Sequence, residues 1–398
     1  MRYLVILVLS LVIWGCPGPD CSCPERESEL FVLSATLAPD GGAQTLSWVY
    51  DHSQSSQEYS PLDCSCLGEG YSRKLHRFSP SGQILWSSED SYEDYYGNVY
   101  YSSLFQGTDL VMAGFVQTQN EREGGLLPII YAENEAREMI RYAVVNNVLF
   151  GEDYDFPQQS VRVQLLTDET FLFYGSDPSG GMKTIKVSAY GEELWSLHTD
   201  ELNLNNYFPL NDGHILIMNR GVGATKLSAS GNEIWSRNIG DGSTAIPYSA
   251  TMGFEGSIIF AGSVQVGTWE TDIMVWHATA TGEVVDSFTV TREGCDDSVR
   301  VMYSAFNDQI ILLSRPRPDC AETAEVIVRI VSHEGEVIAT HSLEPQGSTY
   351  LAGMDIDADG KFIVAATTNA GREDETFYGR IVKYDSDLSI DWSKTFGP

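Results

Sequence analysis

Seven cysteines carry the most reactive side chains of the sequence, and four of them stand in the tetrapeptide Asp-Cys-Ser-Cys, which occurs at 20–23 and again at 63–66. In an oxidising compartment such residues form disulfides, whereas four thiolates at tetrahedral spacing bind a metal. C-x-C pairs are tighter than the usual metal spacing, so we predict disulfides and keep a metal site as the alternative. The candidate cysteines are Cys21, Cys23, Cys64, Cys66, Cys295 and Cys320.

The N-terminus predicts export. One positive charge, Arg2, precedes an apolar run that ends at Gly15-Cys16 and is shorter than the roughly 20 residues that span a bilayer. Its end resembles the lipobox of bacterial lipoproteins, which implies acylation of Cys16 and an address at the outer membrane, on its periplasmic or surface side. We therefore expect a lipoprotein signal peptide at 1–15 and a lipidated, Cys-rich tether at 16–29. Cleavage without a lipid is the alternative.

The charge balance excludes some classes of partner. The chain has 24 Lys+Arg against 56 Asp+Glu, a formal net charge of −32. A nucleic-acid binder needs a basic surface for the phosphates, so we expect no nucleic-acid partner. The same charge opposes docking on anionic lipid, which leaves the lipid as the expected membrane contact. It permits a cation, a basic partner, or solubility alone.

A short pattern recurs seven times and predicts hairpins. A β-prone run leads into a Ser/Asp/Gly turn, and a second alternating run follows it. Glycine supplies the positive φ of the turn, and a tryptophan follows four residues later in the best copies, as a packing wedge between sheets. The copies lie at 77–87, 131–141, 186–196, 226–236, 277–287, 330–340 and 383–393.

A second, more apolar hairpin precedes each copy, as expected for strands buried on both faces. These hairpins lie at 30–50, 103–117, 163–175, 207–219, 250–262, 303–314 and 353–366. Two hairpins make one four-stranded sheet, and radial repetition of such sheets makes a β-propeller. We predict an all-β protein with a single propeller domain at 30–398, in seven blades, with eight as the alternative count.

The Ser230-to-Trp235 element and its counterparts resemble the tryptophan-docking repeat of quinoprotein dehydrogenases and of the propeller lipoprotein of outer-membrane barrel assembly. The resemblance covers most of the chain as degenerate repeats, and those families usually have eight blades. Three copies lack the tryptophan, with Met139 or Ile140, Asp286 and Ala339 near its place. The resemblance implies a PQQ-like propeller fold.

Propeller topology brings certain cysteines together. The connection into a blade and the connection between its second and third strands open on the same face. Cys295 enters the sixth blade and Cys320 follows its second strand, so these two can pair. Cys21 and Cys23 stand in the same relation to Cys64 and Cys66 at the first blade. Two disulfides there would staple the tether to the ring, in a pairing that the sequence leaves open.

The carboxylates suggest two ligand types. Asp355, Asp357 and Asp359 match the first half of a calcium loop, but the later ligands are missing and the inner turn of the seventh blade explains the segment better. No other cofactor is expected. Two acidic loops rich in tyrosine could receive a sugar ring or a basic peptide, with surface loops as the simpler alternative. Their candidate binding residues are Tyr92, Asp94, Tyr95, Tyr96, Asp153, Tyr154 and Asp155.

Catalytic motifs are not evident. The seven histidines form no H-x-x-x-H or HExxH element, and the sequence contains no G-x-S-x-G elbow, P-loop or dinucleotide fingerprint. We expect a monomeric propeller that binds or scaffolds a protein or glycan at the cell envelope. The alternative is a propeller enzyme, either a quinoprotein-like dehydrogenase or a lyase or hydrolase.

Overall fold

The alternating apolar runs fold into 29 β-strands in the computed structural model, together with one 3₁₀ turn at Phe254–Gly256. The structure describes residues 29–397 apart from several segments, and every statement below concerns the described part. The segments outside it are 39, 52–69, 92–97, 107–108, 118–124, 135–138, 146–149, 152–160, 167, 178–179, 200–205, 211, 219–222, 241–244, 268–270, 291–295, 317–325, 344–348 and 369–377.

Each predicted pair of hairpins forms one antiparallel sheet. Blade 1 contains β1 (Glu29–Leu37), β2 (Ala43–Asp51), β3 (Gly70–Phe78) and β4 (Ile84–Ser91). Blade 2 contains β5 (Asn98–Gln106), β6 (Asp109–Gln117), β7 (Gly125–Glu133), β8 (Met139–Val144) and β9 (Phe150–Gly151). Blade 3 contains β10 (Val161–Leu165), β11 (Phe171–Ser176), β12 (Met182–Val187) and β13 (Glu193–Thr199).

The remaining four blades follow the same order. Blade 4 contains β14 (Asn206–Pro209), β15 (Ile215–Met218), β16 (Gly223–Leu227) and β17 (Glu233–Asn238). Blade 5 contains β18 (Ala245–Met252), β19 (Ile258–Gln265), β20 (Thr271–Ala278) and β21 (Val284–Val290). Blade 6 contains β22 (Asp296–Ser304), β23 (Gln309–Pro316), β24 (Ile327–Val331) and β25 (Val337–Ser342). Blade 7 contains β26 (Thr349–Ile356), β27 (Phe362–Thr368), β28 (Tyr378–Tyr384) and β29 (Ile390–Phe396).

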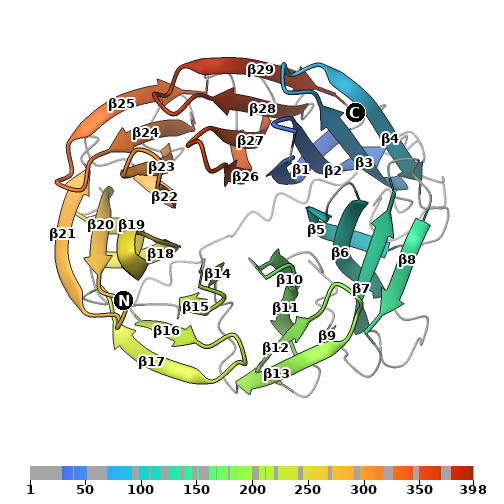
Figure 1. Cartoon of the computed structure of the whole chain (residues 1–398), viewed down its shortest axis with the longest axis horizontal. Coiled ribbons are helices and arrows are strands. Elements are labelled where there is room, and N and C mark those ends of the chain that lie inside the picture. The colour runs from blue at the N-terminus through green and yellow to red at the C-terminus, as the bar shows by residue number, and fades with distance from the viewer. Residues whose placement is uncertain are drawn as a thin grey trace, which may run out of the picture.

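The seven sheets stand around a central axis, with the first strand of each blade innermost and the fourth outermost (Figure 1). The all-β, seven-bladed propeller prediction is therefore confirmed, and the count of eight is wrong. All four strands of each blade come from one stretch of sequence. The ring consequently closes where β1 lies against β26 and β27, by side-chain packing between two complete blades.

Seven hydrophobic clusters hold the described blades together, one at each junction. In β19, Ile258 and Phe260 pack toward blade 4, whereas Ile259 and Ala261 pack toward blade 6. Successive side chains of a strand point to opposite faces, and here both faces are buried. This explains why the second strands are apolar at consecutive positions.

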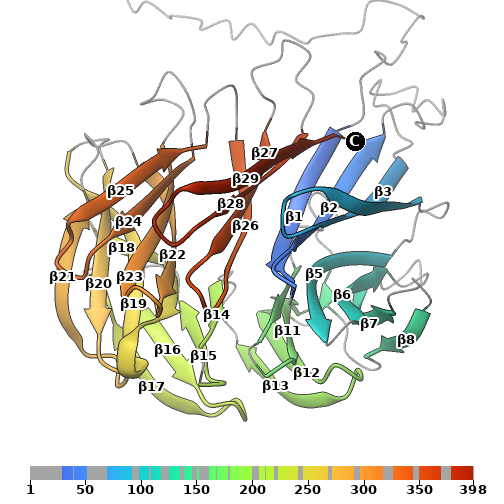
Figure 2. The same ribbon diagram turned by 45° about the horizontal axis from the view of Figure 1, so that its top comes forward.

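The two faces of the ring differ in their connections. One face carries the turns between first and second strands and between third and fourth strands, and we call it the turn face. We call the loop face the opposite one, which receives every connection between second and third strands and between consecutive blades. Figure 2 shows the turns at the lower side of the ring. No helix among the described residues is long and apolar enough to cross a membrane.

Most described turns on the turn face share one geometry. In blade 4, the amide of Ser228 donates to the carbonyl of Asn232 at 2.8 Å, and the amide of Gly231 donates to the carbonyl of Ser228 at 2.9 Å. Gly231 has φ +82°, a conformation that costs a side-chain-bearing residue about 1–2 kcal/mol. Leu388 takes this place in blade 7 with φ 71°. The glycines of the repeated pattern therefore mark real turns, as predicted.

Candidate functional site

The predicted loop residues and cysteines lie outside the described residues. They are Cys16, Cys21, Cys23, Cys64, Cys66, Tyr92, Asp94, Tyr95, Tyr96, Asp153, Tyr154, Asp155, Cys295 and Cys320. The strands beside them are described. Asp296, which follows Cys295, pairs directly with Pro316, the last residue of β23 before the segment that contains Cys320. The two segments thus start from neighbouring strand ends on the loop face, and the disulfides stay predictions.

The three carboxylates of the calcium-loop prediction lie at or beside the turn between β26 and β27, where the repeat register placed them. Asp355 Oδ2 accepts a hydrogen bond from the Leu37 amide of blade 1 at 2.7 Å. Asp357 Oδ1 accepts from the amides of Asp359 at 3.0 Å and Lys361 at 2.9 Å. No group of three or more His, Cys, Asp or Glu among the described residues is arranged to hold a metal. Two of these carboxylates therefore act as acceptors for backbone amides.

Asp355 is the most perturbed of these carboxyl groups. Burial raises its pKa to about 6, assisted by the negative charge of Asp357 and opposed by the amides of Leu37 and Ile356. The pKa of an exposed Asp is 3.8. Because the folded pKa is the higher one, the stability that this group contributes is present below pH 3.8 and is lost as the pH rises through about 6. Asp355 therefore favours the ring closure in acid and opposes it as the pH rises toward neutral.

Tryptophans of the fourth strands dock on the next blade. Trp195 Nε1 donates to the Ala229 carbonyl of blade 4 at 2.9 Å, and Trp235 Nε1 donates to the Ala280 carbonyl of blade 5 at 3.1 Å. The Trp195 ring also covers Gly231, where a Cβ atom would lie 2.8 Å from the ring. Only glycine fits this contact without displacing the ring. The wedge role predicted for the tryptophans is thus seen directly.

Opposite each described tryptophan of a fourth strand stands a buried cation. Lys186 pairs in register with Trp195, and Lys226 pairs with Trp235. The Lys226 ammonium donates to Asp212 Oδ2 at 2.9 Å, from a side chain that is 6% exposed. A buried ammonium needs such a partner because transfer of a bare charge out of water is very costly. The ion pair therefore secures the inner turn to the outer hairpin.

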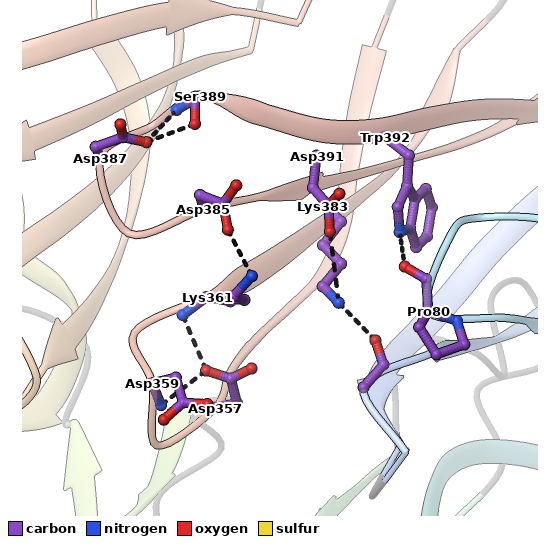
Figure 3. A network of polar contacts seen from close by, with 11 residues as sticks. Pro80, Asp357, Asp359, Lys361, Lys383, Asp385, Asp387, Ser389, Asp391 and Trp392 are labelled. Carbon is purple, nitrogen blue, oxygen red and sulfur yellow. Dashed lines mark hydrogen bonds and ion pairs between the residues drawn. The ribbon is translucent and has the colours of Figure 1, made fainter.

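The same devices close the ring. Trp392 Nε1 donates to the Pro80 carbonyl of blade 1 at 2.8 Å, and Lys383 Nζ donates to the Gly41 carbonyl (Figure 3). The Trp392 ring covers Gly82, where a Cβ atom would lie 2.5 Å from the ring. Residues more than 300 positions apart are joined in this way. The seventh blade thus docks on the first as an ordinary neighbour.

Blades 5 and 6 depart from the pattern. His277 stands where the lysine would be, and it pairs in register with Asp286. In blade 6, Ile330 pairs with Ala339. Blade 2 has also lost both residues, because Ala132 pairs with Arg141. Tryptophan and cation are therefore present together or absent together, which indicates that the two form one structural unit.

A cluster of titratable side chains occupies the altered junction between blades 5 and 6. The rings of His277 and His333 lie 5.1 Å apart, and the rings of Tyr303 and His333 lie 6.0 Å apart. Asp308 Oδ1 accepts from the Tyr303 hydroxyl at 2.6 Å and lies 2.8 Å from His333 Nε2. Phe288 covers the turn glycine Gly335, in the manner of a docked tryptophan. We call His277, Tyr303, Asp308 and His333 the histidine cluster.

Burial and neighbouring charges set the protonation of the histidine cluster. Desolvation and the adjacent His333 lower the pKa of His277. The Tyr303 hydroxyl lowers the pKa of Asp308, with His333 assisting and burial opposing. Burial and Asp308 raise the pKa of Tyr303. His277 is thus neutral at pH 7, and its Nε2 atom is buried with no hydrogen-bond partner among the described residues. That nitrogen is shielded from solvent, and the ring contact of His277 with His333 packs blade 5 against blade 6.

The surface around the histidine cluster is more apolar than the corresponding surface of blades 3 and 4. Phe254 and Phe306, in the inner turns of blades 5 and 6, are 62% and 60% exposed. On the outermost strands, Val284 is 36% exposed and Val337 is 43% exposed, at the places that Glu193 and Glu233 occupy in blades 3 and 4. Exposed apolar groups in contiguous patches mark interaction sites, although single ones are ordinary. Blades 5 and 6 thus expose more apolar side chains at these positions than blades 3 and 4 do, which makes this surface a candidate for binding.

Sequence patterns could have revealed this junction. The histidine cluster joins His277 of blade 5 to the inner turn and the outer turn of blade 6, and these segments are 25 to 56 positions apart. No local motif connects them. The usable signal was the joint loss of lysine and tryptophan at 277 and 286, which only an alignment of the blades displays.

Comparison with known proteins gives structural similarity alone. No family model matches the chain, and no curated protein matches it. BamB from Moraxella catarrhalis shares 12% identity over 88% of this chain and 82% of its own, with a TM-score of 0.42. The WD40 domain of Pan2 from Neurospora crassa shares 10% identity over 86% and 93%, with a TM-score of 0.47. A protein of unknown function from Bacteroides caccae shares 12% identity over 57% and 93%, with a TM-score of 0.29.

Proposed function

We propose that the protein is a binding or scaffolding module of the bacterial cell envelope, and that it engages a protein partner through its loop face. The distribution of connections carries this proposal. All the longer connections, including residues 52–69, 152–160, 317–325 and 369–377, leave the blades on the loop face, whereas the opposite face consists of short hydrogen-bonded turns. Binding residues concentrate on loops that a rigid scaffold positions.

The composition of two loop-face connections supports a basic protein surface as the ligand. Tyr92, Tyr95 and Tyr96 accompany Asp94 between blades 1 and 2, and Tyr154 stands between two aspartates ahead of blade 3. Tyrosine gives a large contact area with a polar end, and carboxylates attract Lys and Arg side chains. A net charge of −32 also favours encounter with a basic partner. A glycan, which tyrosines and carboxylates also bind, is the second candidate ligand.

The expected location is the outer membrane, through a lipid on Cys16. The tether at residues 16–29 leads directly into β1, whose first residue Glu29 pairs with Tyr50 at the loop-face end of blade 1. The chain therefore enters the ring from the loop face. The intact mass of the protein expressed with its own signal tests the anchor, because a Cys16→Ser variant lacks the lipid. An unchanged mass after this substitution, apart from the side chain itself, would contradict the anchor.

The binding proposal can be tested with a photo-crosslinking amino acid in cells. We would place it at Tyr95, in the connection from β4 to β5, and, as a matched control, at Tyr190 on the turn face, which is 66% exposed. We expect a discrete adduct from position 95 and none from position 190. An adduct that a protease removes identifies a protein partner, whereas one that only a glycosidase removes identifies a glycan. No adduct from position 95, or equal adducts from both positions, would contradict the proposal.

A further inference from the structure

The outermost strand of blade 6 has a feature that its counterparts lack. Among the described strands, each fourth strand lies at the edge of its sheet, and proteins usually protect such edges with charged residues. The fourth strands β4, β8, β13, β17, β21 and β29 each contain at least one Asp, Glu, Lys or Arg. Strand β25, with the sequence VIATHS, contains none. It is therefore the least protected edge of the described ring.

The side chains of β25 divide between the core and the solvent. Ala339 packs with the cluster between blades 6 and 7, and His341 Nδ1 lies 2.9 Å from the Tyr384 hydroxyl of blade 7. Val337 and Ile338 are 43% and 52% exposed, and Thr340 is also exposed. Among the described strands, β25 pairs only with β24. The strand is thus held rigidly from one side and presents β-branched residues on the other.

The charge around β25 indicates which kind of segment could bind at this edge. Glu334 and Glu336, immediately before β25, are both exposed, and Glu283 of the neighbouring blade is exposed as well. A second copy of this chain would bring another net charge of −32 to the contact. Like charges oppose that approach, whereas an extended segment with Lys or Arg is attracted to it. Added strands gain affinity from main-chain hydrogen bonds and specificity from alternate side chains.

We propose that β25 receives an extended, basic segment of a protein partner as a fifth strand of blade 6. The segment pairs its backbone with the edge of β25 at Val337–Thr340. Its apolar side chains meet Ile338 and Thr340, and its basic residues meet Glu334 and Glu336. This site lies on the outer wall of the ring and does not depend on the loop face, so either site can fail without the other.

The probe for this proposal is an acetylated, amidated peptide of alternating lysine and valine, added to the whole protein. Hydrogen exchange of the protein reports where it binds. We expect slower exchange confined to residues 336–343, and binding that weakens with salt. The same peptide with an N-methyl group on every residue has no main-chain donor on either edge, and we expect no protection from it. Equal protection by both peptides, or protection spread over the acidic surface, would overturn the proposal.

Two variants separate strand addition from general charge attraction. Ile338→Lys gives β25 the kind of edge charge that the other blades carry, and we expect about tenfold weaker peptide binding. Val285→Lys places the same charge at the matching position of β21 and should change binding by less than about twofold. Equal weakening by both variants, or dimerisation of the protein through β25 in sedimentation experiments, would overturn the proposal.

Discussion

The junction between blades 3 and 4 differs from the junction between blades 5 and 6 in the side chains that join the two blades, although all four blades have the same strand order. In blades 3 and 4, a tryptophan docks on a turn glycine and a buried lysine binds an aspartate of the inner turn. In blades 5 and 6, Phe288 covers the glycine and the histidine cluster replaces the ion pair. The backbone pairing is unaffected by this exchange. Strand pairing and the central hydrophobic layer therefore suffice to make a blade.

This difference shows which part of a junction between blades can vary in sequence. Docked tryptophans form hydrogen bonds across the outer part of a junction, so that part tolerates few substitutions. A junction without them depends on the second and third strands, and its outer strand no longer has to carry the docking residues. Strand β25, which has neither tryptophan nor charge, is the clearest result. Blades 5 and 6 also expose apolar residues in their inner turns and outermost strands, namely Phe254, Phe306, Val284 and Val337.

The largest expected effect comes from removal of a docked ring. Trp235→Ala deletes a side chain that is 7% exposed together with its hydrogen bond to Ala280, and we expect a loss of about 3–5 kcal/mol in the free energy of unfolding. Phe288→Ala, at the altered junction, removes a partly buried ring without a hydrogen bond and should cost at least about 1 kcal/mol less. Urea denaturation measures both. Equal losses would mean that the two junctions are energetically alike.

A smaller effect is expected from the turn glycines. Gly231→Ala meets both an unfavourable φ of +82° and the Trp195 ring, so we expect a loss of about 2–3 kcal/mol. Gly213 of the same blade has φ +77°, but a Cβ atom there meets nothing closer than 4.0 Å. Gly213→Ala is therefore the matched control, with a cost of about 1–2 kcal/mol. Thermal or urea unfolding of both variants tests the docking contact, which would be unimportant if the two losses agree.

Most of the fold was predictable because it is periodic. Alternating runs, turn glycines and tryptophans at fixed spacing placed all 14 hairpins within a few residues of their strands. The blade count followed from the same repeats. The splitting of the fourth strand of blade 2 into β8 and β9 was not predicted. It occurs where β7 contains Pro128, which has no N–H to donate, a local effect that the repeat pattern does not report.

The candidate sites were less predictable. The loop-face residues were chosen by composition, which says what a side chain can bind but not where it lies. Asp355 was assigned to a possible ion because of its spacing, yet its carboxylate accepts a hydrogen bond from Leu37, a residue 318 positions away. The histidine cluster is likewise a contact between blades. Interactions across junctions depend on ring closure, which short spacings in the sequence do not encode.

An intermediate effect is expected from the carboxylates of the inner turns. Asp212→Asn leaves the buried Lys226 without its anionic partner, and we expect a loss of about 1–2 kcal/mol at pH 7. Burial opposes ionisation of Asp212, but its hydrogen bonds with Lys226 and His214 outweigh burial and lower its pKa. Its contribution is thus present above pH 3.8 and is lost as the pH falls further. Asp308→Asn, at the exposed carboxylate of the histidine cluster, should cost less than about 0.5 kcal/mol. Urea denaturation midpoints measure both losses. A larger loss for Asp308→Asn than for Asp212→Asn would contradict the comparison.

The smallest expected effect is a loss of stability in acid at blades 5 and 6 that blades 3 and 4 do not share. The unfolded His277 has a pKa of 6.5, and burial lowers the pKa of the folded residue. As the pH falls below 6.5, the unfolded chain takes up the proton first, so stability at this junction is lost in the direction of acid, by less than about 1 kcal/mol. Hydrogen exchange at pH 7.5 and 5.5, corrected for the intrinsic rate, should show faster opening of β20 and β24 at the lower pH while β12 and β16 keep their protection. His277→Gln has no titrating group at this position and should abolish the difference. If β12 and β16 open equally, or if the variant keeps the pH effect, then the histidine cluster does not distinguish the two regions.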